Sequence, residues 1–237
     1  MLEIAVFNIE SALAAAEAGA DRLELCENPA EGGTTSSYGT LKRVKEKVGI
    51  PVFPIIRPRG GDFLYSDEEF QSMRQDIRLC KELGFEGVVI GLLKPDGHID
   101  IHRTRQLAEL AYPLDVSFHR AFDRCIDPVQ GLEDIISAGC TRILTSGQVP
   151  NAMDGKELIR QLVEKAGDRI IIMPGSGVRS ANIRELANFT GASEMHSSAR
   201  ISVNSAMQFT QSSMNEKLQN THVDSQEIKK MKQALSS

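Results

Sequence analysis

The strongest constraint on the fold is a regular alternation between short apolar runs and longer amphipathic segments. Eight runs rich in aliphatic residues are each followed by a segment of helix length. They cover residues 2–7, 21–26, 52–57, 87–93, 114–120, 142–146, 169–173 and 193–198. Strands that alternate with helices form parallel sheets, because each helix carries the chain back across the sheet. The pattern therefore predicts an α/β protein of eight βα units.

Two arrangements accommodate eight such units, and the chain favours the closed one. A (β/α)8 barrel, or TIM barrel, commonly takes about 200–250 residues, and this chain has 237. The alternative is an open, doubly wound sheet with additional strands, but no G-x-G-x-x-G follows the first run. Helix starts are marked by cap signals at Ser66 and Asp127. We predict a single barrel over residues 1–199.

The C-terminal part departs from this rhythm. Residues 200–223 are polar, rich in Ser, Asn and Gln, and too long for an ordinary connection. Residues 224–235 place Ile228, Met231 and Leu235 on one stripe, which predicts a helix. We expect residues 200–237 to form an extension whose helix packs on the barrel and closes it. The polar stretch before that helix is consistent with a lid, an oligomer contact or a mobile segment.

Charge and composition exclude several classes of partner. The 27 basic and 32 acidic side chains give a net charge of -5, which does not favour binding to nucleic acid. No run approaches the ~20 apolar residues of a membrane span, and the first residues lack a secretory signal. The four cysteines lack paired spacing, which indicates reduced thiols. We expect a cytoplasmic protein without membrane or nucleic-acid partners.

Side-chain alternation along each strand predicts which residues enter the barrel. If Leu23 and Leu25 face the helices, Glu24 and Cys26 face inward. The same argument turns His119 inward near the end of its run. Active sites in such barrels lie at the C-terminal ends of the strands.

Acid/base residues gather at those strand ends. His119 is followed by Asp123, and a histidine near a carboxylate suits proton transfer at neutral pH. Asp62 follows the third run, and Glu24 lies near the end of the second. We predict Glu24, His119, Asp123 and Asp62 as catalytic candidates, with ion pairing in the barrel as the structural alternative.

Inward carboxylates require cations. Glu3 faces inward deep in the first run, where an ion pair is the favoured explanation. Arg57 and Arg59, held between prolines and glycines, are the expected cations and also offer a rigid fork for a carboxylate or a phosphate.

A second anion-binding segment follows the seventh run. Residues 174–180 read PGSGVRS and lead into a helix, where glycines expose backbone N–H groups to an anion. The loops after strands seven and eight are the usual phosphate site of these barrels. The predicted ligands are Gly175, Gly177, His196, Ser197 and Ser198; a tight turn that requires glycine is the alternative.

A metal site is predicted only weakly by the residues themselves. The chain has no C-x-x-C or H-E-x-x-H motif. Cys26 and Cys125 are the two thiols that could share the rim of the barrel, and two thiolates could bind Cu(I) linearly, with His119 or a partner subunit completing the site.

Several of these motifs together resemble the CutC family. They are residues 19–26 (GADRLELC), 54–63 (PIIRPRGGDF), 118–123 (FHRAFD), 144–147 (LTSG) and 196–198 (HSS). The resemblance covers about residues 1–200 and implies a cytoplasmic (β/α)8 barrel that forms a homo-oligomer. It also implies a role in copper homeostasis, with Cys26 as a copper ligand.

Two functions follow from the sequence. The first is copper handling, with Cu(I) bound by Cys26 and Cys125. The second is an enzyme that binds a small phosphorylated or carboxylated metabolite at the rim and acts on it by acid/base catalysis. Whether the protein is an enzyme remains open between them.

Overall fold

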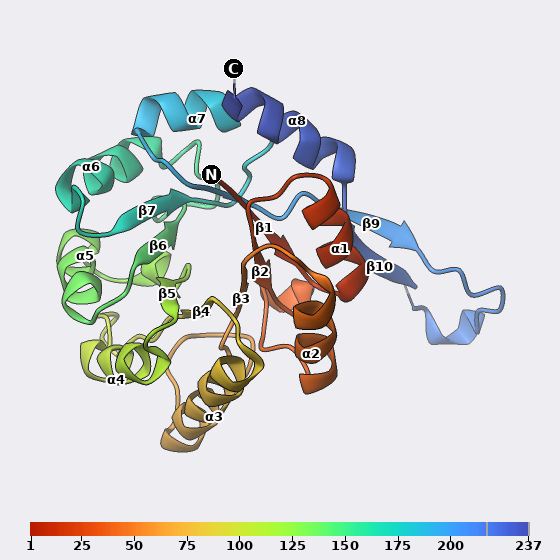
Figure 1. The fold of residues 1–237 in the computed structure, drawn as a ribbon, viewed down its shortest axis with the longest axis horizontal. Coiled ribbons are helices and arrows are strands. Elements are labelled where there is room, and N and C mark those ends of the chain that lie inside the picture. Colours follow the sequence, from red (N-terminus) through yellow and green to blue (C-terminus); the bar gives the residue numbers. More distant parts are fainter. Residues whose placement is uncertain (217, 237) are drawn as a thin grey trace.

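The eight predicted strands and the helices between them form a ring. The computed structural model describes residues 1–216 and 218–236. The strands of the ring are β1 (Leu2–Val6), β2 (Arg22–Leu25), β3 (Val52–Pro54), β4 (Gly87–Ile90), β5 (Asp115–Phe118), β6 (Arg142–Thr145), β7 (Ile171–Pro174) and β8 (Met195–Ser197). The helices are α1 (Ile9–Glu17), α2 (Tyr38–Lys47), α3 (Asp67–Leu83), α4 (Ile101–Ala111), α5 (Pro128–Ser137), α6 (Lys156–Ala166), α7 (Ile183–Thr190) and α8 (Ser225–Ser236). Figure 1 shows the strands enclosed by the helices.

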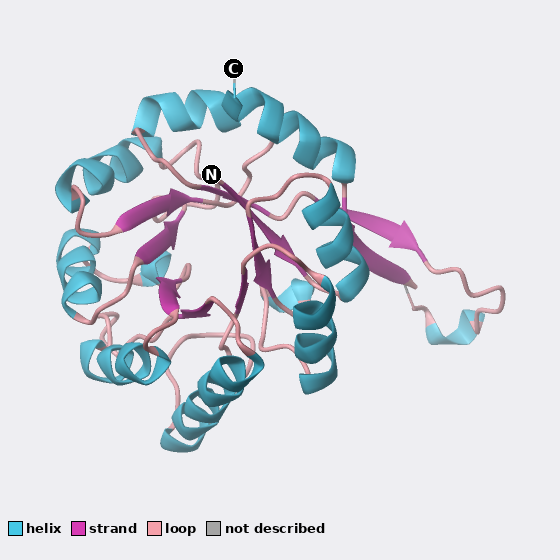
Figure 2. Ribbon diagram, in the orientation of Figure 1, coloured by secondary structure: helices cyan, strands magenta, loops and turns pink. Residues whose placement is uncertain are grey.

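Parallel pairing confirms the barrel architecture. One hydrogen-bonded arc has the order β3-β2-β1-β8 and the other β4-β5-β6-β7. A parallel bridge between Ile55 and Val89 joins the two arcs at β3 and β4, and β7 lies in contact with β8. The first strand thus pairs with the last, which brings the strands into a ring rather than an open sheet (Figure 2). The prediction of a (β/α)8 TIM barrel is confirmed.

The predicted helix starts are also present. The Ser66 hydroxyl accepts a hydrogen bond from the Glu69 N–H at 3.2 Å, and the Glu69 carboxylate accepts one from the Ser66 N–H at 2.8 Å. Asp127 caps α5 by accepting from Val129 and Gln130. These caps satisfy N–H groups that the first turn of a helix leaves free.

Side chains alternate between two layers as the sequence predicts. Leu23 and Leu25 belong to the large core between the strands and the helices. Cys26 instead belongs to a small cluster inside the ring with Phe53 and Ile55. A one-residue shift in a strand changes the face of its side chain, so this layering fixes which residues reach the interior.

Residues after β8 form an antiparallel hairpin. Its strands are β9 (Arg200–Asn204) and β10 (Gln219–Val223), and Figure 1 shows it extending away from the ring beside α1. Ile201 and Val203 alternate with polar residues in β9, but β10 is polar up to Val223, so the segment as a whole reads as a polar loop and the sequence did not predict the hairpin. The exposed apolar side chains of this segment are Ile201, Val203, Met207, Phe209 and Met214.

The predicted C-terminal helix is confirmed as α8. Ile228 and Met231 are buried, and the helix packs between α7 and α1. Lys232 pairs with Asp21 at 2.6 Å, which ties α8 to the loop before β2. The outer layer of helices is therefore continuous between the last and the first units.

Candidate functional site

A cavity of about 820 Å³ opens at the C-terminal ends of the strands. It is lined by the ends of β1, β2, β3, β5, β6, β7 and β8 and by the loops that follow them. This is the rim on which barrel enzymes build their sites. The predicted site residues that line it are Glu24, Cys26, Arg57, His119, Asp123, Gly177, His196, Ser197 and Ser198.

Three of the interior side chains form a continuous cluster across neighbouring strands. Glu3 and His196 are register partners on β1 and β8, and Ala5 is the partner of Glu24 on β2. His196 Nδ1 lies 2.8 Å from Glu3 Oε1. His196 Nε2 lies 3.7 Å from Glu24 Oε2. The imidazole is therefore oriented by one carboxylate and faces a second one.

Burial and neighbouring charges shift the pKa values of all three residues in this cluster. Burial, together with the charge of Glu3, raises the pKa of Glu24 to about 7, although His196 lowers it. Burial alone lowers the pKa of His196, but the hydrogen bond to Glu3 and the charge of Glu24 produce a net rise. Burial opposes ionisation of Glu3, yet His196 and Arg22 lower its pKa to about 2. The ionised form is strongly favoured for Glu3, whereas the pKa of Glu24 lies near neutral pH.

The cation that partners Glu3 is Arg22, not Arg57 or Arg59 as predicted. Arg22 Nε donates to Glu3, and its Nη2 donates to Glu194 at 2.6 Å. Arg22 precedes Glu24 by two residues on β2 and so points into the same interior. The ion pair expected at Glu3 is present, but its partner comes from the adjacent strand.

The Arg57 guanidinium binds backbone carbonyl groups and is not a free bidentate group for a ligand. Its Nη1 donates to the carbonyl oxygens of Glu31 at 2.6 Å and Gly33 at 2.7 Å, and its Nη2 donates to Gly61 at 3.0 Å. These bonds join the loop after β2 to the loop after β3. Arg57 thus shapes the cavity mouth and supplies positive charge there, while both of its terminal nitrogens are already engaged.

Arg59 and Asp62 lie outside the cavity, contrary to their predicted roles. Arg59 Nη2 donates to Asp62 Oδ1 at 2.9 Å, and Arg59 Nε donates to Glu69 at 2.5 Å. The Asp62 side chain is 71% exposed. The two glycines that precede Asp62 turn the chain outward before it can reach the rim, so this pair is a surface ion pair.

His119 lines the cavity, but its protonation differs from the predicted acid/base role. The Ala121 N–H donates to His119 Nδ1 at 3.1 Å, which places the proton of the neutral ring on Nε2. Burial and the charges of Arg57 and Arg124 lower the pKa of His119 to about 3. The imidazole is therefore neutral at physiological pH and acts as an N–H donor.

This assignment predicts how His119 behaves on acidification. We expect the ring to keep the neutral Nε2–H form from pH 8 to pH 4, whereas an exposed histidine gains a proton near pH 6.5. Because the folded pKa is lowered, this group favours the folded state most above pH 6.5, and its contribution is lost as the pH falls towards 3. Nitrogen-15 NMR of the ring tests this; a titration near pH 6 would contradict it.

Asp123 is not the partner of His119. Its carboxylate accepts hydrogen bonds from the Thr145 hydroxyl at 2.5 Å and from the Ser146 N–H at 3.0 Å. It also pairs with Arg120 Nε at 2.7 Å. These bonds anchor the loop after β6 to the loop after β5, so Asp123 shapes the cavity wall.

The loops after β7 and β8 are arranged differently from a simple phosphate loop. Gly175 leaves room for neighbours, since a Cβ there would lie 2.4 Å from Leu144 and 3.1 Å from His196. Gly177 lines the cavity with a φ of +70°. The Ser180 N–H, near the start of α7, already donates to the Glu227 carboxylate of α8 at 2.7 Å. The helix terminus is thus partly occupied by a side chain of the C-terminal helix.

The eighth strand supplies the remaining predicted anion ligands. The Ser197 hydroxyl donates to the Val178 carbonyl at 2.7 Å, which links the two loops. Ser198 lines the cavity. His196, predicted as an anion ligand, belongs instead to the cluster with Glu3 and Glu24.

Arginines that the sequence did not single out line the mouth. They are Arg120, Arg124, Arg179 and Arg200. With Arg57 they make five cations, against the three acidic lining residues Glu24, Glu31 and Asp123. Arg200 begins β9, so the base of the hairpin contributes to the cavity. Arg120 stands in the FHRAFD segment and Arg179 in the PGSGVRS segment, but loops from separate units bring the four arginines together, which spacing along the chain does not show.

The predicted pair of copper ligands does not meet in the cavity. Cys26 is buried, and burial together with Glu24 raises the pKa of its thiol well above the usual value. Cys125 is not a lining residue; it lies near Gly131 and Gln148, and burial raises its pKa to about 11. Within residues 1–216 and 218–236, no group of three or more His, Cys, Asp or Glu side chains is arranged to hold a metal.

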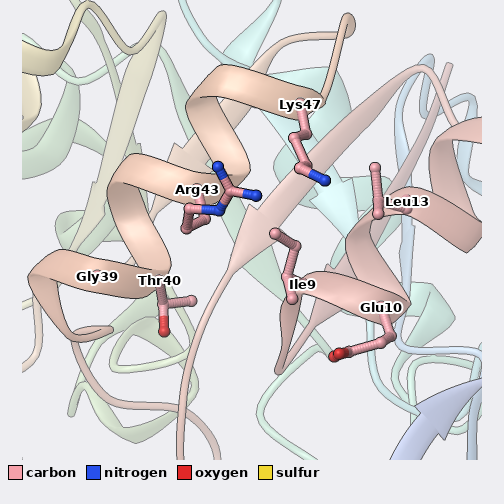
Figure 3. Close-up of a pocket in the computed structure, with 7 residues that line it drawn as sticks. All are labelled: Ile9, Glu10, Leu13, Gly39, Thr40, Arg43 and Lys47. Atoms are coloured by element: carbon pink, nitrogen blue, oxygen red, sulfur yellow. The ribbon is translucent and has the colours of Figure 1, made fainter.

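A second, smaller pocket lies between α1 and α2 on the outside of the barrel. Its volume is about 390 Å³. Figure 3 shows Arg43 and Lys47 extending from α2 over a floor that includes Ile9 and Leu13 of α1. Its ionisable side chains, Glu10, Arg43 and Lys47, are all exposed to solvent, so we assign the functional site to the central cavity.

Comparison with known proteins shows which family this chain is related to. The model of the CutC family matches residues 1–201. The chain belongs to the CutC family. A family protein CutC from Chromobacterium violaceum is 53% identical over 209 residues, which cover 88% of this chain and 85% of that protein. The human copper homeostasis protein cutC homolog is 48% identical over 90% of this chain and 78% of its own length.

Solved structures agree with the family assignment. The crystal structure of CutC from Streptococcus agalactiae superposes with a TM-score of 0.80 at 35% identity, and covers 84% of this chain and 98% of that one. Phosphoribosylanthranilate isomerase from Thermotoga maritima has a TM-score of 0.61 at 16% identity, over 99% of this chain and 98% of that one, a likeness of fold alone. In the described part of the chain, every helix is too short or too polar to span a membrane.

Proposed function

We propose that this CutC-family protein is an enzyme that moves a proton on a small phosphorylated or carboxylated metabolite bound in the central cavity. The observation that carries the proposal is the alignment of Glu3, His196 and Glu24, with separations of 2.8 Å and 3.7 Å. A buried carboxylate that orients a histidine, with a second acid/base group beside it, is a recurrent arrangement in proton-transfer sites. A purely structural ion pair does not require the third group.

The charge of the mouth supports an anionic ligand. Five arginines face three acidic residues around the cavity, although the protein as a whole has a net charge of -5. A local excess of positive charge in a concave site concentrates anions. Arg179 and Arg200, next to the loops after β7 and β8, are the proposed anion ligands together with Gly177 and Ser198.

Copper is the role that the names of the relatives carry, and the cavity does not fit Cu(I) well. Cu(I) prefers thiolate or thioether ligands. The cavity presents one thiol, Cys26, whose thiolate is disfavoured by burial and by Glu24. We expect neither the wild-type protein nor Cys26→Ser to bind Cu(I) stoichiometrically, as measured by competition with a chromogenic chelator. Stoichiometric binding that is lost in this variant would support the copper role instead.

Ethyl phosphate is the probe for the proposed function. At about one hundred times its dissociation constant, a ligand stabilises the folded state by about 2.7 kcal/mol, so the melting temperature should rise by several degrees. We expect Arg179→Gln combined with Arg200→Gln to remove this rise. Arg160→Gln on α6, outside the cavity, serves as the matched control.

Binding must also occur beside the proton carriers. We expect ethyl phosphate to shift the ring resonances of His196 in nitrogen-15 NMR and to leave those of the exposed His98 unchanged. Absence of a thermal shift, or a shift that leaves His196 unaffected, would contradict the proposed function.

A further inference from the structure

Two buried N–H groups in the cavity wall have no hydrogen-bond acceptor. They are His119 Nε2 and Arg57 Nε, and each residue is only 4% exposed. A buried donor without an acceptor costs about 1–3 kcal/mol, so such groups in a folded protein need an explanation. Both residues line the cavity. An oxygen atom of a bound ligand is an acceptor that would satisfy them.

The two donors lie on the same part of the wall, around Phe63. The ring centroids of Phe63 and His119 are 4.9 Å apart. The guanidinium carbon of Arg57 lies 5.0 Å from the centroid of the Phe63 ring. Both residues therefore contact Phe63, and each has an unpartnered N–H in the cavity wall, one on a neutral ring and the other on a charged guanidinium.

The orientation of His119 is fixed by its surroundings. A Cβ at Gly91 would lie 2.3 Å from the His119 ring, so only glycine leaves space for the ring there. The Ala121 N–H donates to Nδ1 at 3.1 Å and fixes the rotation of the ring. Because packing determines the ring position, the orphaned Nε2–H is a built feature of the wall and not one pose of a mobile side chain.

The proton carriers lie on the opposite side of the ring of strands. Glu24 and His196 come from β2 and β8, the two neighbours of β1. His119 follows β5, which is the fourth strand along from β1 in either direction around the ring (Figure 1). A ligand in the cavity therefore has the orphaned donors on one side and the acid/base pair on the other.

We propose that the substrate is a carbonyl compound, that His119 Nε2–H donates to its carbonyl oxygen, and that Glu24 and His196 move a proton at the adjacent carbon. This inference rests on the proposed function and names its substrate class. Glu24 removes a proton from the carbon next to the carbonyl group. The C–H electron pair becomes the C=C bond of an enolate, and the carbonyl π electrons move to the oxygen held by His119 and Arg57.

The return of the proton completes the reaction without another reactant. Glu24 or His196 delivers it to the enolate oxygen, so the C–H bond that is lost is replaced by an O–H bond, the carbonyl compound becomes its enol, and nothing is oxidised overall. Because Glu24 and His196 are only 3.7 Å apart, both act on the same face of the substrate. The geometry favours transfer from the α-carbon to the oxygen, as in keto–enol isomerisation, over inversion at one carbon, which requires bases on opposite faces.

A pair of ligands separates this inference from the proposed function. Ethyl phosphate carries only the anionic group, whereas 2-phosphoglycolate adds a carboxylate that mimics the enolate. We expect calorimetric titration of the wild-type protein to show at least about tenfold tighter binding of 2-phosphoglycolate, since a hydrogen bond to a charged group contributes about 1.5–3 kcal/mol. In His119→Phe, 2-phosphoglycolate should bind less than about twofold more tightly than ethyl phosphate. The affinity for ethyl phosphate should be the same as in the wild-type protein.

Each outcome decides the proposal. Equal affinities in the wild-type protein, or an advantage that persists in His119→Phe, would overturn the inference and leave the proposed function standing. If neither ligand binds, both fall. Where His119→Phe does not fold, the wild-type protein still gives an answer. The Nε2 proton of His119 should move downfield in proton NMR with 2-phosphoglycolate and not with ethyl phosphate, and an unchanged resonance would refute the assignment.

Discussion

Replacement of Glu3 by leucine is expected to lower the free energy of unfolding by about 3–5 kcal/mol, the usual effect of removing one partner from a buried ion pair. Glu3 is fully enclosed, and it satisfies both Arg22 and His196. Leucine leaves the guanidinium of Arg22 with Glu194 alone and removes the acceptor of His196 Nδ1. Urea denaturation of the two proteins at pH 7 measures the difference.

The pH dependence of this loss has a defined sign. The pKa of Glu3 is lowered from 4.5 to about 2 in the folded protein. Its stabilising contribution is therefore complete above pH 4.5 and is lost as the pH falls towards 2. The difference in the free energy of unfolding between the wild-type protein and Glu3→Leu should therefore decrease as the pH falls from 4.5 towards 2. Asp62→Asn is the matched control, because its pair with Arg59 is exposed and contributes at most about 1 kcal/mol. Equal losses in the two variants would contradict the account.

Asp123→Ala should destabilise the protein by about 3 kcal/mol, because each buried donor left without an acceptor costs about 1–3 kcal/mol. The carboxylate holds the Thr145 hydroxyl and the Ser146 N–H, and also receives the Gln148 N–H at 3.3 Å. Chemical denaturation measures the effect.

The same substitution should loosen the loop after β6. Hydrogen exchange at the Ser146 and Gln148 amides is expected to become faster, because their acceptor is gone. Asp96→Ala provides a control at an exposed turn, where Asp96 caps only its own loop. If Asp123→Ala unfolds at the same denaturant concentration as the wild-type protein and its loop amides stay protected from exchange, Asp123 does not anchor this loop.

Periodicity was sufficient to predict the barrel and its inward-facing residues. Glu24 and Cys26 alternate with Leu23 and Leu25, and a strand with one face against helices leaves a single register. His119 was placed at the rim by the same argument. These predictions succeed because they depend on one strand at a time.

Predictions that depend on pairs of distant residues were less successful. Asp123 was assigned to His119, yet it accepts from Thr145 and Ser146 on the next unit. The functional cluster joins Glu3 and His196, which are 193 positions apart. Spacing along the chain does not encode such contacts; they arise from the pairing of the first strand with the last. Alternation does mark Arg22 as inward, since it precedes Glu24 by two residues on β2.

The hairpin was missed for a different reason. Its two strands pair only with each other, and Ile201 and Val203 remain exposed. The alternation is limited to these two residues, and the rest of residues 204–222 is mostly polar, so the sequence resembles a long polar loop. Its first residue, Arg200, nevertheless reaches the cavity mouth.

A crystal structure with 2-phosphoglycolate tests the central claim most directly. We predict the ligand in the central cavity, with its carboxylate near His119 and Glu24 and its phosphate near Gly177, Ser198 and Arg179. A ligand bound instead in the α1–α2 pocket lined by Arg43 and Lys47, with the central cavity free of it, would contradict the assignment of this cavity as the functional site.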